Sequence, residues 1–166
     1  MFEKLVLVHT NLENDEILKK SFSKDCQVIY CNEESIVFDI IKQIKTPESI
    51  KYLSFMYHFQ GWYNIPFFNT DHEKILSSIS KYNKNHYLNL EQKYSYVDTQ
   101  IIYLIKYLKE KNNNLVVDLL SCDLDYNFFH EDIEKVQVDL DIDIRYSIDK
   151  TGNNQYGGNW VLESHN

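Results

Sequence analysis

The sequence predicts an α/β fold built on a mostly parallel sheet, and two observations lead to that prediction. Short apolar runs rich in branched and aromatic residues recur along the chain, as is typical of strands buried on both faces. Between these runs lie segments whose apolar residues repeat at helical intervals. Strands that alternate with amphipathic helices indicate a parallel sheet with crossover helices.

The first part of the chain follows the order strand, helix, strand, helix, strand. We expect strands at 5–9, 26–30 and 52–57, and helices at 14–22 and 36–44. The second helix has the clearer pattern, because its apolar residues recur every three or four positions and a proline follows it.

The middle of the chain continues this alternation. A capping box at 70–73 opens a short helix that reaches residue 79, and an aspartate at 98 caps a helix with a wide apolar stripe. A strand at 115–120 follows directly. Residues 82–96 show no clean period, so we expect an irregular excursion over the surface.

Apolar and polar residues alternate strictly from 136 to 148, which predicts one long strand with a buried and a solvated face, at least from Val138 on. The aspartates of this run could be interpreted as ligands of a calcium site. An EF-hand loop would need Gly and Glu where the chain has Ile144 and Lys150, so we interpret them as a solvated acidic face. Turns at 150–154 and a terminal strand at 159–163 complete the prediction.

Length, composition and charge narrow the class of protein. The 166 residues suffice for one core, and the chain has neither an internal repeat nor a Pro/Gly-rich linker, so we expect a single domain over 1–166. A net charge of −8 argues against nucleic acids and anionic membranes as partners. No apolar stretch approaches the roughly 20 residues of a membrane span, and the start does not resemble a signal peptide. We therefore expect a cytoplasmic protein.

The three cysteines fit a reducing compartment. Cys26 and Cys31 lie five positions apart on one expected strand, so their side chains should point to opposite faces and not share a metal or a disulfide. No set of His, Cys and carboxylate residues has the spacing of metal ligands, and no Gly-rich phosphate loop follows the first strand. We expect no metal and no cofactor.

Two expected strands end in residues that are able to do chemistry. The strand at 52–57 leads directly to His58, and the strand at 115–120 leads to Cys122. If the two strands are parallel neighbours, both side chains emerge at the sheet edge where open α/β folds have their sites. A thiol beside an imidazole is the minimal set for a cysteine nucleophile. Taken singly, each residue is also explained as a structural group.

An aromatic loop follows His58. Trp62, Tyr63, Phe67 and Phe68 form either an interaction surface for a protein partner or a loop whose rings bury one another over the sheet edge. The sequence leaves both alternatives open.

The order of these motifs resembles the caspase-like domain of unknown function found in large bacterial surface and adhesin proteins. The matching elements are the strand ending in His58, the strand ending in Cys122-Asp123, the Ser-Ile-Asp-Lys-Thr-Gly stretch at 147–152 and the closing Gly-Gly-Asn-Trp-Val-Leu-Glu at 157–163. The resemblance covers nearly the whole chain. It implies a three-layer α/β/α sandwich and a catalytic pair of His58 and Cys122, with Asp123 in the lining of the site.

Two departures from that family bear on activity. Phe59 stands where a small residue usually follows the His, with Gly61 displaced by two positions, and Ser121 stands where a Gly usually precedes the Cys. Glycine is favoured at such positions because substrate approaches the backbone closely. We therefore expect a degenerate, non-catalytic domain that acts as a protein-interaction or structural module in a homo- or hetero-assembly.

The alternative is a cysteine endopeptidase with a His58/Cys122 dyad, in which the thiolate attacks the scissile carbonyl and backbone N–H groups hold the oxyanion. The abundance of Lys, Asn, Ile and Tyr is typical of AT-rich genomes. Such a bias suits a large DNA virus or an AT-rich microbe, and if the chain is viral we expect a structural component located within a virion instead of the cytoplasm.

Overall fold

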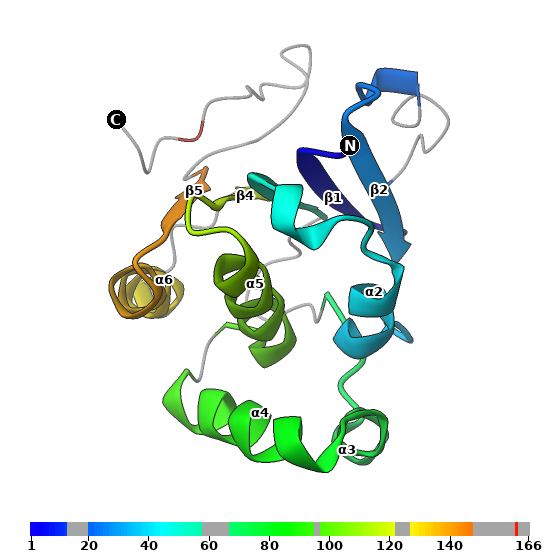
Figure 1. Cartoon of the computed structure of the whole chain (residues 1–166). Helices are drawn as coiled ribbons and strands as arrows, with labels where there is room; N and C mark the ends of the chain where they lie inside the picture. Colours follow the sequence, from blue (N-terminus) through cyan, green and yellow to red (C-terminus); the bar gives the residue numbers. More distant parts are fainter. Residues whose placement is uncertain (13–19, 58–66, 95–96, 122–126, 148–161, 163–166) are drawn as a thin grey trace.

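A computed structural model describes residues 1–12, 20–57, 67–94, 97–121, 127–147 and 162 (Figure 1). Within them lies a five-stranded, all-parallel sheet in the order β2-β1-β3-β4-β5. The strands are β1 (Lys4–His9), β2 (Cys26–Cys31), β3 (Tyr52–Met56), β4 (Val116–Leu120) and β5 (Asp143–Tyr146). The predicted α/β class with a parallel sheet is confirmed.

Helices cover one face of the sheet in two tiers. α2 (Val37–Gln43), α5 (Thr99–Lys111) and α6 (Asn127–Leu140) lie next to the strands, and α3 (His72–Ser78) and α4 (Lys81–Lys93) lie beyond them (Figure 1). A short 3-10 turn, η1 (Pro47–Ser49), leads into β3. The long crossovers between parallel strands are what place these helices on the sheet.

The main core lies between this face and α5. Alternate strand residues point into it, so Leu5, Leu53 and Val117 from three neighbouring strands are all fully buried. From the helix side, Leu104 and Leu108 meet them at a spacing of four residues, which puts both on one face of α5. Burial of such side chains is the principal source of stability.

The opposite face of the sheet has a smaller apolar cluster. Val6, Val8 and Met56 are its buried members. Further along this face, the guanidinium Nε and Nη2 atoms of Arg145 both lie 2.7 Å from Oδ1 of Asp118 on the adjacent strand. The helix predicted at 14–22 falls mostly outside the described residues, as do the turns and terminal strand predicted after residue 148.

The prediction of one long strand over 136–148 is wrong in its first half. Residues 127–140 form α6, and only Asp143–Tyr146 pair with the sheet. Ile133 and Val136 are buried at a spacing of three, whereas Val138 is 83% exposed, which is the pattern of a helical face. The helix ends at Leu140, and the positive φ of 49° at Asp141, the next residue, lets the N–H of Ile142 donate back to the carbonyl of Gln137.

The prediction of an irregular excursion at 82–96 is also wrong, because α4 occupies most of it. Tyr87 and Leu90 on α4 and Tyr94 directly after it are buried, and α4 packs on α5. These few buried side chains are separated by polar residues, so the helical period of this segment is weak in the sequence. Packing against a neighbour stabilises such a helix more than its own pattern indicates.

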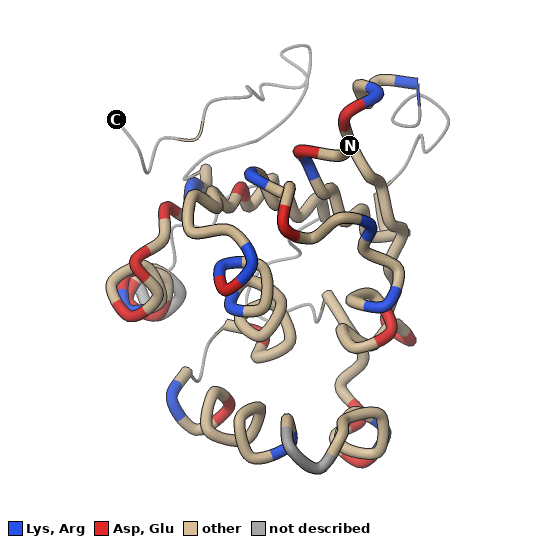
Figure 2. The backbone as a smooth tube through the Cα atoms, in the orientation of Figure 1, with Lys and Arg blue, Asp and Glu red and all other residues tan. Residues whose placement is uncertain are grey.

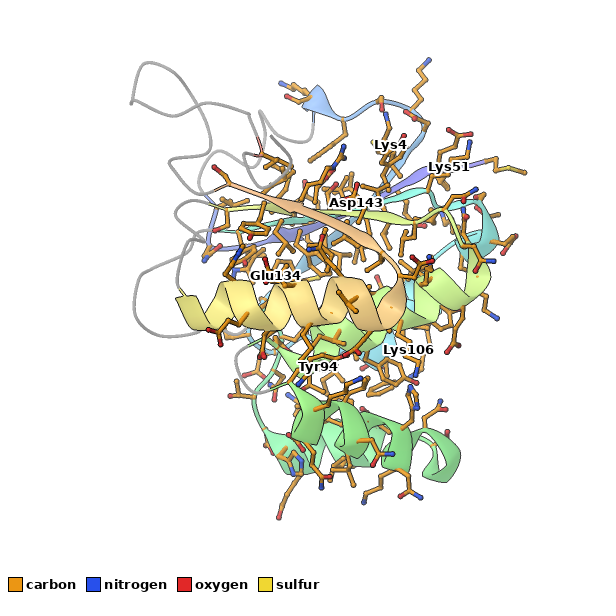
Figure 3. All side chains as sticks on the ribbon, turned by 90° about the vertical axis from the view of Figure 1, so that its left-hand side faces the viewer. Lys4, Lys51, Tyr94, Lys106, Glu134 and Asp143 are labelled. Atoms are coloured by element: carbon orange, nitrogen blue, oxygen red, sulfur yellow. The ribbon has the colours of Figure 1, made fainter. Side chains whose placement is uncertain are left out.

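Charged pairs gather at the amino ends of the strands. Lys4 lies 3.2 Å from Asp25, and Lys51 lies 2.9 Å from Glu3 (Figure 3). Figure 2 shows acidic and basic residues interspersed along the described backbone. Exposed pairs of this kind add little stability. These charged pairs lie at the amino edge of the sheet, whereas the candidate site lies at the opposite, carboxyl edge.

Candidate functional site at the carboxyl edge of the sheet

The register of the sheet sets the two candidate strand ends side by side. β3 and β4 are parallel neighbours, with Met56 opposite Leu120. In the sequence, His58 follows two residues after Met56 and Cys122 two residues after Leu120. The strand arrangement that the dyad hypothesis requires is therefore present. His58 and Cys122 themselves lie outside the described residues, as do Gly61, Trp62, Tyr63 and Asp123.

The strand ends that the structure describes at this edge are buried. Tyr57, directly after β3, is 8% exposed, and Ser121, directly after β4, is 2% exposed. His9 and Cys31 at the ends of β1 and β2 are equally enclosed. The side chain of Ser121 thus fills space beside the backbone at the position where the resembled family has glycine.

His9 ends β1 with its imidazole inside the protein, 4% exposed. Its Nδ1 accepts a hydrogen bond of 3.1 Å from the backbone N–H of Asn11, so the neutral ring has its proton on Nε2. That Nε2 is buried and has no hydrogen-bond partner in the structure as described. Sequence reasoning placed His9 in a strand but missed it as a site residue; the available signal was a polar residue closing an apolar run.

Phe67 and Phe68 belong to the core and not to an interaction surface. They are 1% and 0% exposed, and their ring centroids lie 5.1 Å apart. The Phe67 ring also meets Phe55 at 5.3 Å and Tyr57 at 5.5 Å, both edge to face. Of the two alternatives that the sequence left open, mutual burial therefore holds for these two residues, because the sheet edge offers them an aromatic surface.

A polar network fixes the segment that follows these phenylalanines. Gln100, which is buried, donates 2.8 Å to the carbonyl of Asn69 and accepts 3.0 Å from the N–H of Val37. Asn69 donates its own N–H to the carbonyl of Ser35 at 2.7 Å. Three segments far apart in the sequence are thereby joined at the carboxyl edge, and each buried polar group has its partner.

Asp98 caps α5 from the same place. Its carboxylate accepts 2.8 Å from the N–H of Gln100 and also accepts from the N–H groups of Phe68 and Ile101. Burial nevertheless raises the pKa of Asp98 to about 6, because desolvation of the carboxylate outweighs these donors. Burial, together with the Asp98 charge, also raises the pKa of the Tyr57 phenol.

This raised pKa predicts a pH-dependent stability. The folded protein binds the Asp98 proton more tightly than the unfolded chain, so the stabilising contribution is present below about pH 4 and is lost as pH rises through about 6. Asp98→Asn keeps an N-capping oxygen and removes this titration. We expect the variant to gain stability relative to wild type between pH 4 and 7, by at most about 3 kcal/mol. Urea unfolding at a series of pH values measures it, and parallel curves for the two proteins would contradict it.

The thiols that the structure describes are structural. Cys31 lies in the main core and Cys26 against the smaller cluster on the other face, which confirms their predicted opposite orientation. Burial raises the pKa of the Cys31 thiol to about 12, so it has almost no thiolate at neutral pH. Cys26 is half-buried, with its sulfur 3.3 Å from the hydroxyl of Ser23.

His130 on α6 is a second histidine among the described residues near this edge. One ring nitrogen meets the hydroxyl of Tyr146, and the other lies 3.0 Å from the carboxylate of Glu134, which Figure 3 places on α6. Both nitrogens are occupied, so His130 joins α6 to β5 and does not offer a base. In the described part of the chain, no group of three His, Cys, Asp or Glu residues is arranged to hold a metal ion.

The described helices include none that is long and apolar enough to cross a membrane. Comparison with protein-family models, with curated proteins and with solved structures found no match to this chain.

Proposed function

We propose that this chain is a caspase-like domain whose site at the ends of β3 and β4 has lost catalysis, and that it acts by binding another protein chain within an assembly. The observation that supports this most directly is the burial of Ser121 and Tyr57, the residues next to Cys122 and His58. A peptidase must let a substrate backbone approach these positions. A serine side chain enclosed there occupies the space that glycine would leave.

A second candidate function is cysteine endopeptidase activity. The register of β3 and β4 favours it: Met56 lies opposite Leu120, and in the sequence His58 and Cys122 each follow two residues after these paired positions. In that mechanism the Cys122 thiolate attacks the scissile carbonyl and His58 gives a proton to the leaving amine. The arrangement of β3 and β4 is compatible with this chemistry. The burial of Tyr57 and Ser121 argues against peptidase activity.

Incubation of the protein with a mixed peptide library separates the two candidates. The products are identified by mass spectrometry. We expect wild type to give no cleavage products that are absent from the Cys122→Ala control. Ser121→Gly is the informative companion variant, because it restores the residue type of the resembled family and removes the enclosed side chain. Cleavage by wild type that disappears in Cys122→Ala would replace the binding proposal with the peptidase.

A further inference from the structure

The two edge strands of the described sheet, β2 and β5, are built differently (Figure 1). β5 has only four residues, two of them charged, and the N–H of Ile144 already donates 2.9 Å to the side chain of Gln137. Short, charged edge strands resist pairing with a further strand. β2 has six residues and contains neither a charged residue nor a proline, although 25% of the chain is charged. The edge at β2 therefore lacks the protection that the edge at β5 has.

The backbone of β2 alternates between β1 and the outside of the sheet. The carbonyl of Asp25, just before the strand, accepts a hydrogen bond of 3.3 Å from the N–H of Lys4. The carbonyl of Cys31, at its end, accepts one of 2.9 Å from the N–H of Thr10. The odd-numbered residues thus face β1, and the N–H and C=O of Val28 face away from it. No described group bonds to them, so they form a template for another strand.

Opposite charges flank this strand. Lys24 lies shortly before β2 and Glu33 shortly after it, and both side chains are exposed. Neither has an ion-pair partner among the residues that the structure describes. A strand of this length spans about 20 Å, so the two charges of one chain are too far apart to meet. In an antiparallel pair of two β2 strands, the Lys24 end of each strand lies beside the Glu33 end of the other. The charge pattern is therefore complementary to a second copy of itself.

We propose that β2 pairs in an antiparallel manner with β2 of a second copy of this chain, so that one sheet runs through a twofold-symmetric dimer. Val28 then lies opposite its own counterpart, and each donates its N–H to the carbonyl of the other. The formal charge of −8 on each copy opposes association, and the uncharged strand is where two copies meet without like charges in contact. The proposal rests on the proposed function in that the partner is a protein chain. It names that partner and the surface.

Sedimentation velocity over a wide range of protein concentrations measures the association. We expect wild type to change from monomer to dimer as the concentration rises. Val28→Pro removes the outward N–H but none that pairs with β1, and proline is tolerated at such a position of an edge strand. It should weaken dimerisation at least about tenfold, because each copy loses one hydrogen bond. Circular dichroism verifies that the variant folds, and Val28→Lys takes its place if it does not.

A charge swap tests whether the partner is a second copy. Lys24→Glu and Glu33→Lys each place like charges at both ends of the paired strands, so each should weaken dimerisation by at least about threefold. The double variant restores opposite charges and should dimerise nearly as well as wild type. Lys84→Glu on α4 and Glu131→Lys on α6 are the matched controls. They change the net charge equally at exposed positions outside β2 and should leave dimerisation unchanged.

Three results would overturn the proposal: a wild type that stays monomeric at every concentration, a folded Val28 variant that dimerises as wild type does, or a double charge variant no better than the single ones. Recovery of the dimer in the double variant supports the antiparallel pairing of two copies. None of these measurements depends on Cys122 or on peptide cleavage. A failure here is therefore distinguishable from a failure of the non-catalytic assignment.

Discussion

Phe67→Ala is expected to lower the free energy of unfolding by about 3–5 kcal/mol, the largest effect of any single substitution considered for this chain. The Phe67 ring lies edge to face with four other rings at centroid distances of 5.1 to 5.5 Å, so its removal leaves a cavity and breaks every one of these contacts. Equilibrium unfolding in urea measures the loss from the shift of the midpoint.

Two companion variants make the Phe67 result interpretable. Phe67→Leu keeps most of the apolar volume and should lose less stability than the alanine variant. Val138→Ala removes a side chain that is 83% exposed on α6 and should change stability by no more than about 0.5 kcal/mol. A loss below about 1 kcal/mol in Phe67→Ala would show that the ring is not packed in the core, and the interaction-surface interpretation would regain support.

Gln100→Met should cost about 2–4 kcal/mol, because it leaves the buried N–H of Val37 and the buried carbonyl of Asn69 without their partners. Methionine has a similar length and helix propensity, so the change isolates the two hydrogen bonds. The loss is measured by urea unfolding, with hydrogen exchange at the Val37 amide as the local readout.

Gln92→Met serves as the control for Gln100, since Gln92 is exposed on α4 and the same chemical change there should be nearly neutral. If both variants lose the same small amount, the network around Gln100 does not hold the three segments together. If only Gln100→Met is destabilised and the Val37 amide exchanges faster, the network fixes the start of α2 to the start of α5.

The elements that the sequence predicts well are those with one dominant period. The strands β1 to β4 are short apolar runs, and α5 has a wide apolar stripe, so local pattern and tertiary burial agree. The region from 136 to 148 was misjudged because α6 ends and β5 begins within it, and the two patterns join into a false period of two. The helix α4 was missed because its stability comes from packing on α5.

The candidate site also has one part that the sequence predicts and another that it does not. The neighbouring placement of the strands that lead to His58 and Cys122 is predictable, because parallel crossovers have few topological solutions. The buried network of Asn69, Gln100 and Asp98 is not predictable, since its members join segments separated by 30 residues or more. The burial of His9 Nε2, which has no hydrogen-bond partner in the structure as described, depends on tertiary packing, and no local pattern encodes it.

The central claim, that the site at the ends of β3 and β4 does not catalyse, is tested most directly by the rate at which iodoacetamide modifies each cysteine of the native protein between about pH 5 and pH 9. Cys31 is the internal reference for a buried thiol and Cys26 for a half-buried one. We expect Cys122 to resemble Cys31, with modification only on unfolding. Rapid labelling of Cys122 with an apparent pKa well below about 8.5, lost in His58→Ala, would contradict this account and establish an activated nucleophile.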